Sequence, residues 1–146
     1  MPAATTTQYC TFLLDGLYFG VDVQRVQEVL RPQQLTPVPL APSHVNGLIN
    51  LRGQIVTALD LRQRLGLPPR QGGRPPMKIV IRSDEEAVAI LVDEIGEVVD
   101  VDEDRFERPP ETLQGGAREL IPGAYKLADR LLLILDTDRA IHVGQG

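Results

Sequence analysis

The strongest constraint on the fold of this chain is an internal repeat. Residues 19–30 (FGVDVQRVQEVL) align with residues 88–99 (VAILVDEIGEVV), and Glu28 falls on Glu97 in this alignment. Residues 55–60 (IVTALD) align in the same way with residues 131–136 (LLLILD), so that in each half a long apolar strand is followed by an aspartate. The pattern predicts two copies of one small β unit. A chance similarity between short runs of Val and Ile is the alternative explanation.

The length of each copy predicts how the copies are arranged. A half of roughly 70 residues buries too little apolar surface to be stable alone. We therefore expect an all-β fold of two small barrels that pack face to face around a shared apolar core, with a groove where they meet. Lobe 1 is expected over residues 15–67 and lobe 2 over residues 77–141, separated by the Pro- and Gly-rich segment 68–76.

The apolar runs are short and are separated by turn residues. Asp15-Gly16 and Arg52-Gly53 are predicted to form tight hairpin turns, because glycine tolerates the positive φ that such turns require. Two segments stay ambiguous, residues 23–30 between a helical turn and a bent strand, and residues 93–101 between a strand and a turn. Strands are expected at 9–14, 17–23, 48–51, 55–61, 77–82, 87–92 and 130–135, and helical turns at 61–65 and 136–141.

The remaining segments are predicted to be loops and tails. Residues 31–43 contain four prolines, which exclude a helix interior or a central strand and allow at most an edge strand over 35–38. Residues 102–116 are predicted to form a loop. The domain is expected to span 8–141, with flexible tails at 1–7 and 142–146 and a first strand that packs on either lobe.

Composition argues against several functional classes. The formal net charge is −5, which disfavours a protein that binds a nucleic-acid backbone or an anionic membrane surface. No apolar run approaches the ~20 residues of a membrane-spanning helix, and the N-terminus lacks the features of a secretory signal. Cys10 is the single cysteine and is expected to be a buried structural thiol in a cytosolic protein. No spacing of His, Cys, Ser or acidic residues indicates a catalytic, cofactor or metal site.

Arg52 is the residue that chemistry singles out. It places a permanent charge at the tip of an otherwise apolar hairpin, with Glu28 as a possible partner. One interpretation is an exposed turn residue that contributes about 0–1 kcal/mol even when paired. The other is an ion pair on an apolar docking face, where it would fix the register of a bound partner.

The run VNGLINLRGQIVTALDLRQRLGL resembles the signature of the CheW-like domain family, the adaptors of bacterial chemotaxis arrays. Weaker matches follow in the same order: FGVDVQRVQEVL, AILVDEIGEVVDV and DRLLLILDTDRAI. The resemblance implies two five-stranded SH3-like barrels around a shared core. It also implies a non-catalytic adaptor without cofactors, free-standing because no kinase or receiver region is attached.

The same resemblance implies two partners and their sites. Such adaptors bind the cytoplasmic tip of a chemoreceptor, which would lie in the groove between the barrels, and the regulatory domain of the histidine kinase CheA. Asn46 departs from the family, in which this position is often basic, and a second kinase contact is placed only loosely, over residues 113–125. The receptor-binding residues carried over are Val23, Val26, Glu28, Arg52, Gly53 and Ile55, and the kinase-binding residues are Leu35, Thr36 and Asn46.

The resemblance also implies a cytoplasmic location, peripheral to the inner-membrane receptor array. An alternative function is a tandem β-barrel module that binds extended peptides by adding a strand to a sheet edge. The pathway is open as well, because the family serves flagellar, pilus-based and other chemosensory systems.

Overall fold

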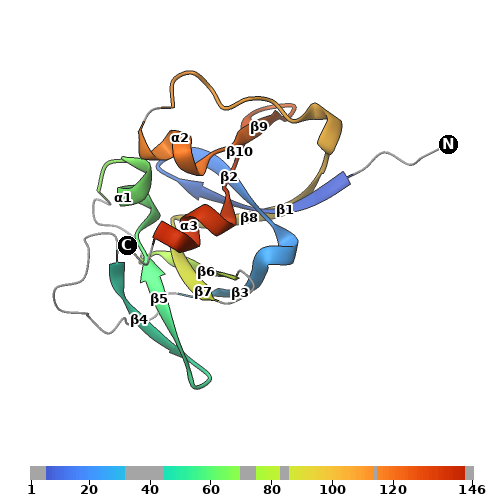
Figure 1. Cartoon of the computed structure of the whole chain (residues 1–146). Helices are drawn as coiled ribbons and strands as arrows, with labels where there is room; N and C mark the ends of the chain where they lie inside the picture. The colour runs from blue at the N-terminus through green and yellow to red at the C-terminus, as the bar shows by residue number, and fades with distance from the viewer. Residues whose placement is uncertain (1–5, 32–44, 70–74, 83–85, 114, 144–146) are drawn as a thin grey trace.

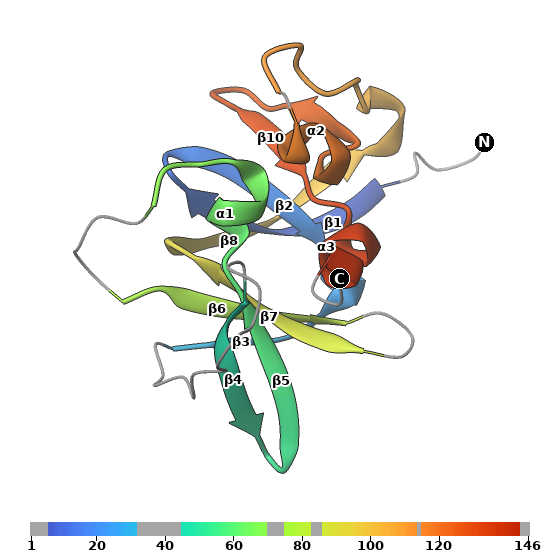
Figure 2. The same cartoon turned by 60° about the vertical axis from the view of Figure 1, so that its left-hand side comes forward.

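The computed structural model describes residues 6–31, 45–69, 75–82, 86–113 and 115–143, and its chain trace is shown in Figure 1. Within these described residues, ten strands form two five-stranded sheets. The predicted all-β class is therefore confirmed. In Figure 2 one sheet lies above the other, with short helices between them at the sides.

Sheet A has the strand order β8-β1-β2-β10-β9. All neighbouring strands are antiparallel except β2 and β10, which run parallel. Asp15 and Gly16 both have positive φ, 52° and 76°, which makes the tight β1–β2 turn that the Asp-Gly pair predicts. The bounds are β1 (Thr6–Leu14), β2 (Leu17–Asp22), β8 (Glu94–Asp102), β9 (Gly123–Lys126) and β10 (Leu131–Ile134).

Sheet B has the strand order β3-β6-β7-β5-β4, again with one parallel pair, β5 with β7. The bounds are β3 (Val26–Leu30), β4 (Val45–Leu51), β5 (Gln54–Leu59), β6 (Met77–Arg82) and β7 (Ala87–Val92). The ambiguity over residues 23–30 is resolved as a 3-10 turn followed by a strand. The ambiguity over residues 93–101 is resolved as a strand, β8.

The helices are short, between three and seven residues long. Asp60 caps α1 through its carboxylate, which accepts from the Arg62 backbone N–H at 3.0 Å, and Gly66 ends the helix at φ 72°. Helix α2, which lies before β9, was not predicted, because it has only five residues and begins at a glycine, Gly116. The bounds are η1 (Val23–Arg25), α1 (Leu61–Leu65), η2 (Glu103–Arg105), α2 (Gly116–Leu120) and α3 (Thr137–Val143).

Each sheet curves into a small SH3-like barrel with its own apolar interior. In sheet B the two edge strands contribute to one cluster, since Leu30 of β3 packs with Ile49 and Leu51 of β4. In sheet A, Tyr9 of β1 and Val101 of β8 pack with Tyr125 of β9. We refer to these units as barrel A and barrel B.

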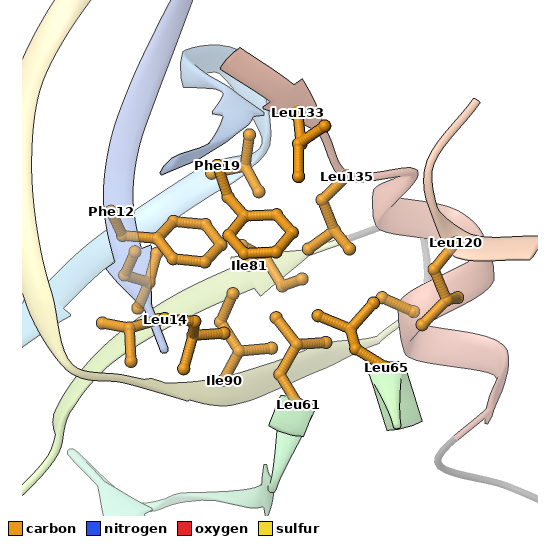
Figure 3. Packing of buried hydrophobic residues seen from close by; sticks show 14 of the residues in the cluster. Phe12, Leu14, Phe19, Leu61, Leu65, Ile81, Ile90, Leu120, Leu133 and Leu135 are labelled. Atoms are coloured by element: carbon orange, nitrogen blue, oxygen red, sulfur yellow. The ribbon is translucent and has the colours of Figure 1, made fainter. Parts of the chain in front are cut away.

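A third and larger cluster, the central core, lies between the barrels and is shown in Figure 3. Phe12 and Phe19 of sheet A stack with ring centroids 5.4 Å apart, and Ile81 and Ile90 of sheet B belong to the same cluster. Strand side chains alternate between the two environments: on β6, Ile81 faces the central core and Val80 faces the interior of barrel B. The predicted shared core is therefore confirmed.

The strand pairing confirms the internal repeat. In sheet A, Leu133 pairs with Phe19 and Ile134 with Gly20. In sheet B the aligned residues pair in the same register, Thr57 with Val88 and Ala58 with Ala89. The two sheets therefore have equivalent strand orders, in which β8, β1, β2, β10 and β9 of sheet A correspond to β3, β6, β7, β5 and β4 of sheet B.

The expected lobe limits differ from the observed barrels. The segment 68–76 separates the two sequence copies, but each copy contributes strands to both sheets: β1 and β2 lie in sheet A, whereas β6 and β7 lie in sheet B. The chain crosses between the barrels after β2 and again after β7. Barrels that exchange strands in this way cover each other's apolar faces, which sequence alignment alone does not reveal. The tails also differ, since β1 begins at Thr6 and α3 runs to Val143.

Candidate functional site

The β4–β5 hairpin projects from barrel B and carries Arg52 at its tip (Figure 2). Arg52 and Gly53 have φ angles of 53° and 88°, so both central residues of the turn are left-handed, as the tight-turn prediction requires. The Asn50 side chain accepts a hydrogen bond from the Gly53 N–H at 2.9 Å. The turn thus holds a non-glycine residue in a conformation that favours Gly, Asn or Asp.

A bulge in β3 sets the direction of Glu28. Val26 pairs with Ile81 and Glu28 pairs with Val80, so Gln27 is an extra residue on β3. Ile81 faces the central core, whereas Val80 faces the interior of barrel B. The bulge therefore lets Val26 pack against the central core while Glu28, only two residues later, is turned to the other side of the sheet.

Glu28 and Arg52 form a bidentate ion pair that connects the two edge strands of barrel B. The Arg52 Nη1 and Nη2 atoms donate to the two Glu28 carboxylate oxygens at 2.7 and 3.1 Å. The strands that carry them, β3 and β4, lie at opposite edges of sheet B, so the pair spans the point where the barrel closes. The predicted proximity is confirmed. Because the Arg52 side chain is 76% exposed, the pair stabilises the fold by no more than about 1 kcal/mol.

The other predicted receptor-binding residues fall into two groups. Ile55 is 60% exposed, and Gly53 is exposed beside it in the turn. Val23 and Val26 are half-buried and pack against the central core, at the crossover from sheet A to sheet B. Sequence reasoning missed Val29, which is 42% exposed on β3 next to Glu28. Val29 pairs with Ile79, which belongs to the central core, so Val29 lies on the face of β3 opposite to Glu28.

The predicted kinase-binding residues cannot be placed in the same detail. Leu35 and Thr36 lie outside the described residues, as does the edge strand expected over 35–38. Asn46 lies in β4, two residues before Leu48, and the structure describes its backbone but not its side chain.

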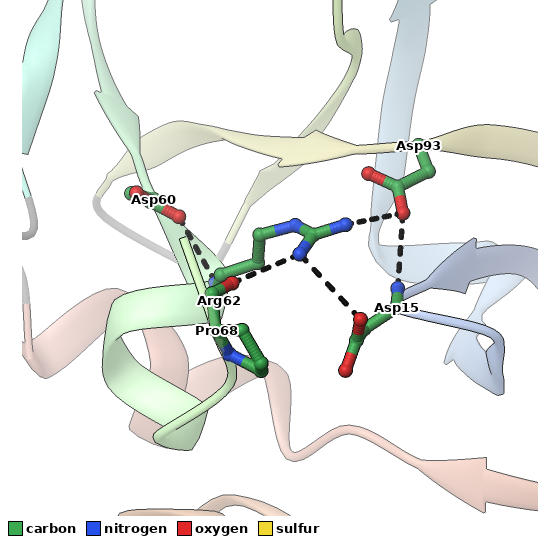
Figure 4. A network of polar contacts seen from close by, with 5 residues as sticks. All are labelled: Asp15, Asp60, Arg62, Pro68 and Asp93. Carbon is green, nitrogen blue, oxygen red and sulfur yellow. Dashed lines mark hydrogen bonds and ion pairs between the residues drawn. The ribbon is translucent and has the colours of Figure 1, made fainter. Parts of the chain in front are cut away.

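A second polar cluster, drawn in Figure 4, lies between the barrels and was not singled out from the sequence. Arg62 of α1 donates to Asp93 Oδ2 at 2.7 Å and to the Pro68 carbonyl at 2.9 Å, and it lies 3.8 Å from Asp15 Oδ1. Its side chain is only 12% exposed. The Asp-Leu-Arg sequence that follows β5 was visible, but its partners come from distant parts of the chain.

Two of the buried titratable groups, Cys10 and Tyr9, belong to apolar clusters. Cys10 is 6% exposed, as predicted, and burial raises the pKa of its thiol. Burial also raises the pKa of Tyr9, whose ring lies 5.8 Å from that of Tyr125 inside barrel A. Within the described part of the chain, no group of three or more His, Cys, Asp and Glu side chains is arranged to hold a metal ion.

In the described residues, no helix has the length and apolar character needed to cross a membrane. The features that remain are an exposed ion pair and exposed aliphatic side chains such as Ile55 on the surface. They are carried by two barrels that share a common core. These features define a double-barrel binding scaffold.

Comparison with known proteins identifies the family. The family model described as "CheW-like domain" matches residues 8–145, and the chain belongs to that family. Chemotaxis protein CheW of Bacillus subtilis is 31% identical over 137 residues, covering 94% of this chain and 88% of the relative. Chemotaxis protein CheW of Treponema pallidum is 28% identical over 133 residues, covering 88% of this chain and 78% of the relative.

A solved structure shows the same architecture. The crystal structure of the scaffolding protein TtCheW from Thermoanaerobacter tengcongensis superposes with a TM-score of 0.81 at 28% identity, and 90% of each chain is covered. The fold and the family together show that this chain is a coupling adaptor of chemotaxis signalling.

Proposed function

We propose that this adaptor couples the cytoplasmic tip of a chemoreceptor to the regulatory domain of the histidine kinase CheA, as a non-catalytic protein of the cytoplasm. The observation that carries the proposal is the exposed, bidentate Glu28–Arg52 ion pair. The fold gains little from an ion pair in water. The preformed geometry of the Glu28–Arg52 pair suits a contact that loses its water when a partner covers it. In that setting the pair fixes the register of the partner more than it raises the affinity.

The proposed receptor site combines this pair with aliphatic side chains on the β4–β5 hairpin and at the junction of the barrels. Ile55 is exposed, and Val23 and Val26 are partly buried at the junction of the barrels. A helical receptor hairpin presents apolar residues at i, i+3, i+4 and i+7, which suits an apolar groove between two barrels. The receptor site is thus proposed to consist of Val23, Val26, Glu28, Arg52, Gly53 and Ile55.

The proposed kinase site lies on another part of the first sequence copy, at Leu35, Thr36 and Asn46. A second kinase contact is proposed on barrel A around residues 113–125. There, Leu113 lines an apolar depression of about 360 Å³ together with Leu17 and Leu131. Two partners held on separate surfaces would let receptor signals reach the kinase as a difference in how both are held.

Arg52→Asn is the sharpest test of the receptor site. Asparagine removes the guanidinium but accepts positive φ, so the turn is retained, whereas Arg52→Ala also strains the backbone. We expect Arg52→Asn to keep the melting temperature of the parent and to weaken binding of a receptor-tip fragment, measured by isothermal titration calorimetry, with kinase-domain binding unchanged.

Lys126→Asn provides the matched control, because Lys126 forms an exposed ion pair with Glu107 at 3.7 Å on barrel A. It should leave receptor binding intact. Thr36→Ala is expected to weaken binding of the kinase regulatory domain alone. Unchanged receptor affinity in Arg52→Asn would remove this residue from the site, and equal loss of both partners would indicate a folding defect.

A further inference from the structure

Among the described residues, two polar contacts lie at the junction of the barrels, and they occupy equivalent places in the internal repeat. The first is the Arg62 cluster (Figure 4). The second is the pair between Arg25 of η1 and Asp138 of α3. In the repeat alignment Asp138 falls on Arg62, and Arg25 lies one residue beyond the position that matches Asp93. The two contacts therefore have the same location in the two copies, with the charges reversed.

Each contact lies at the junction of the barrels. Arg62 follows β5 of sheet B, Asp93 lies at the crossover from β7 to β8, and Asp15 forms the β1–β2 turn of sheet A. On the other side, Arg25 lies at the crossover from β2 to β3, and Asp138 follows β10 of sheet A. In Figure 2, α1 and α3 lie on opposite sides between the two sheets, which places the contacts at opposite ends of the junction.

The two contacts differ strongly in burial and in hydrogen bonding. The Arg62 guanidinium is 12% exposed and its donors reach Asp93 at 2.7 Å and the Pro68 carbonyl at 2.9 Å. Asp93 Oδ2 also accepts from the Asp15 N–H at 2.9 Å, and the Asp93 N–H donates to the Leu13 carbonyl at 2.9 Å. Removing one partner of such a buried network leaves charge without compensation, so this end resists separation.

The contact at the other end is weak. Arg25 and Asp138 approach to 3.7 Å, and their side chains are 40% and 53% exposed. Exposed pairs at this distance contribute little and are screened by salt. Val23 belongs to the same short helix as Arg25, and both Val23 and Val26 are only half-buried against the central core.

We propose that the junction between the barrels is a hinge, held closed at the Arg62 cluster and able to widen at the Arg25–Asp138 pair. The change in angle is small enough to keep the central core buried, and it alters the exposure of Val23 and Val26. This last consequence rests on the proposed receptor site; the hinge itself does not.

Charge reversal at the weak end tests the hinge in the full chain. Arg25→Glu places two carboxylates together, and Asp138→Lys places two cations together, so each variant should push the barrels apart. The double variant Arg25→Glu/Asp138→Lys restores an attractive pair. Arg25→Gln, which only removes the attraction, should have a smaller effect in the same direction.

The readout is the distance between two spin labels, measured by pulsed electron paramagnetic resonance in a Cys10→Ala background. Arg82 of β6 and Asp104 of η2 are exposed, lie in different barrels and suit labelling after replacement by cysteine. We expect a longer mean distance and a wider distribution in Arg25→Glu and in Asp138→Lys, and the parent distribution in the double variant.

The control is Lys126→Glu, which reverses one charge of another exposed pair at 3.7 Å, within barrel A, and should leave the distance unchanged. Parent-like distances in Arg25→Glu, Asp138→Lys and Arg25→Gln would overturn the hinge. A receptor-tip fragment is then added to the labelled parent. If the hinge variants behave as expected but the fragment leaves the distance unchanged, receptor docking at Val23 and Val26 is wrong and the hinge stands.

Discussion

At the scale of single residues, the packing of β1 against β8 depends on a glycine, Gly96, that lies opposite the buried Thr11. Thr11 is fully buried, and its hydroxyl donates to the Glu97 carbonyl at 2.5 Å. Thr11 faces two residues of β8, Gly96 and Glu97, because the β1–β8 register shifts between Cys10 and Phe12. A Cβ atom at Gly96 would lie 2.4 Å from Thr11 Oγ1, so glycine is required there for space.

Gly96→Ala is expected to destabilise the fold by about 1–3 kcal/mol, the usual cost of overpacking. Thr11→Ala should also destabilise it, because the hydrogen bond to Glu97 is lost, but it creates room for the added methyl group. The double variant should therefore be more stable than the sum of the single effects predicts. Urea unfolding of the four proteins measures this coupling, and strict additivity would contradict the steric explanation.

At the scale of secondary-structure elements, bulges rather than strand periodicity direct the side chains of the site. The bulge at Gln27 in β3 and the bulge at Gly96 in β8 occupy matching places in the repeat alignment. In β3 the extra residue separates Val26, which packs on the central core, from Glu28, which pairs with Arg52. A regular strand would place both on the same face.

Deleting Gln27 is expected to remove the bulge, so that Val26 and Glu28 cannot both keep their environments. We predict a loss of stability of about 2 kcal/mol or more, as for a disrupted core contact. Gln27→Ala retains the extra residue and should change stability by no more than about 0.5 kcal/mol. Thermal unfolding followed by circular dichroism compares the two variants, and similar melting temperatures would show that the bulge is unimportant.

At the scale of the whole molecule, the central core and the exchange of strands make the barrels interdependent. Phe12 of sheet A and Ile90 of sheet B share one cluster, and neither sheet is built from one continuous half of the chain. Separating the barrels would expose that cluster and pull on both crossover segments. The chain should therefore unfold as one cooperative unit.

Calorimetry tests this expectation. A single transition is predicted, with equal calorimetric and van't Hoff enthalpies, and Phe12→Ala in the central core should cost about 3–5 kcal/mol. Leu132→Ala, in the interior of barrel A, should lower the same single transition rather than split it. Two separable transitions in either variant would show that the barrels fold independently.

The sequence by itself determined the hairpin turns and the symmetry of the two β units. Asp15-Gly16 and Arg52-Gly53 predict their turns because few residues tolerate positive φ. The repeat predicts two equivalent β units and a shared core, since neither half is large enough to be stable alone. These are local or additive properties, and spacing and composition are sufficient to reveal them.

Tertiary structure alone decided which strands form each barrel and which side chains meet. The crossovers after β2 and β7 depend on which apolar faces cover each other, a choice made among distant segments. Glu28 reaches Arg52 because a bulge and the closure of barrel B coincide, and Arg62 reaches Asp93 and Asp15 because three separate segments converge. Such contacts follow from the packing of the whole chain, which no local pattern encodes.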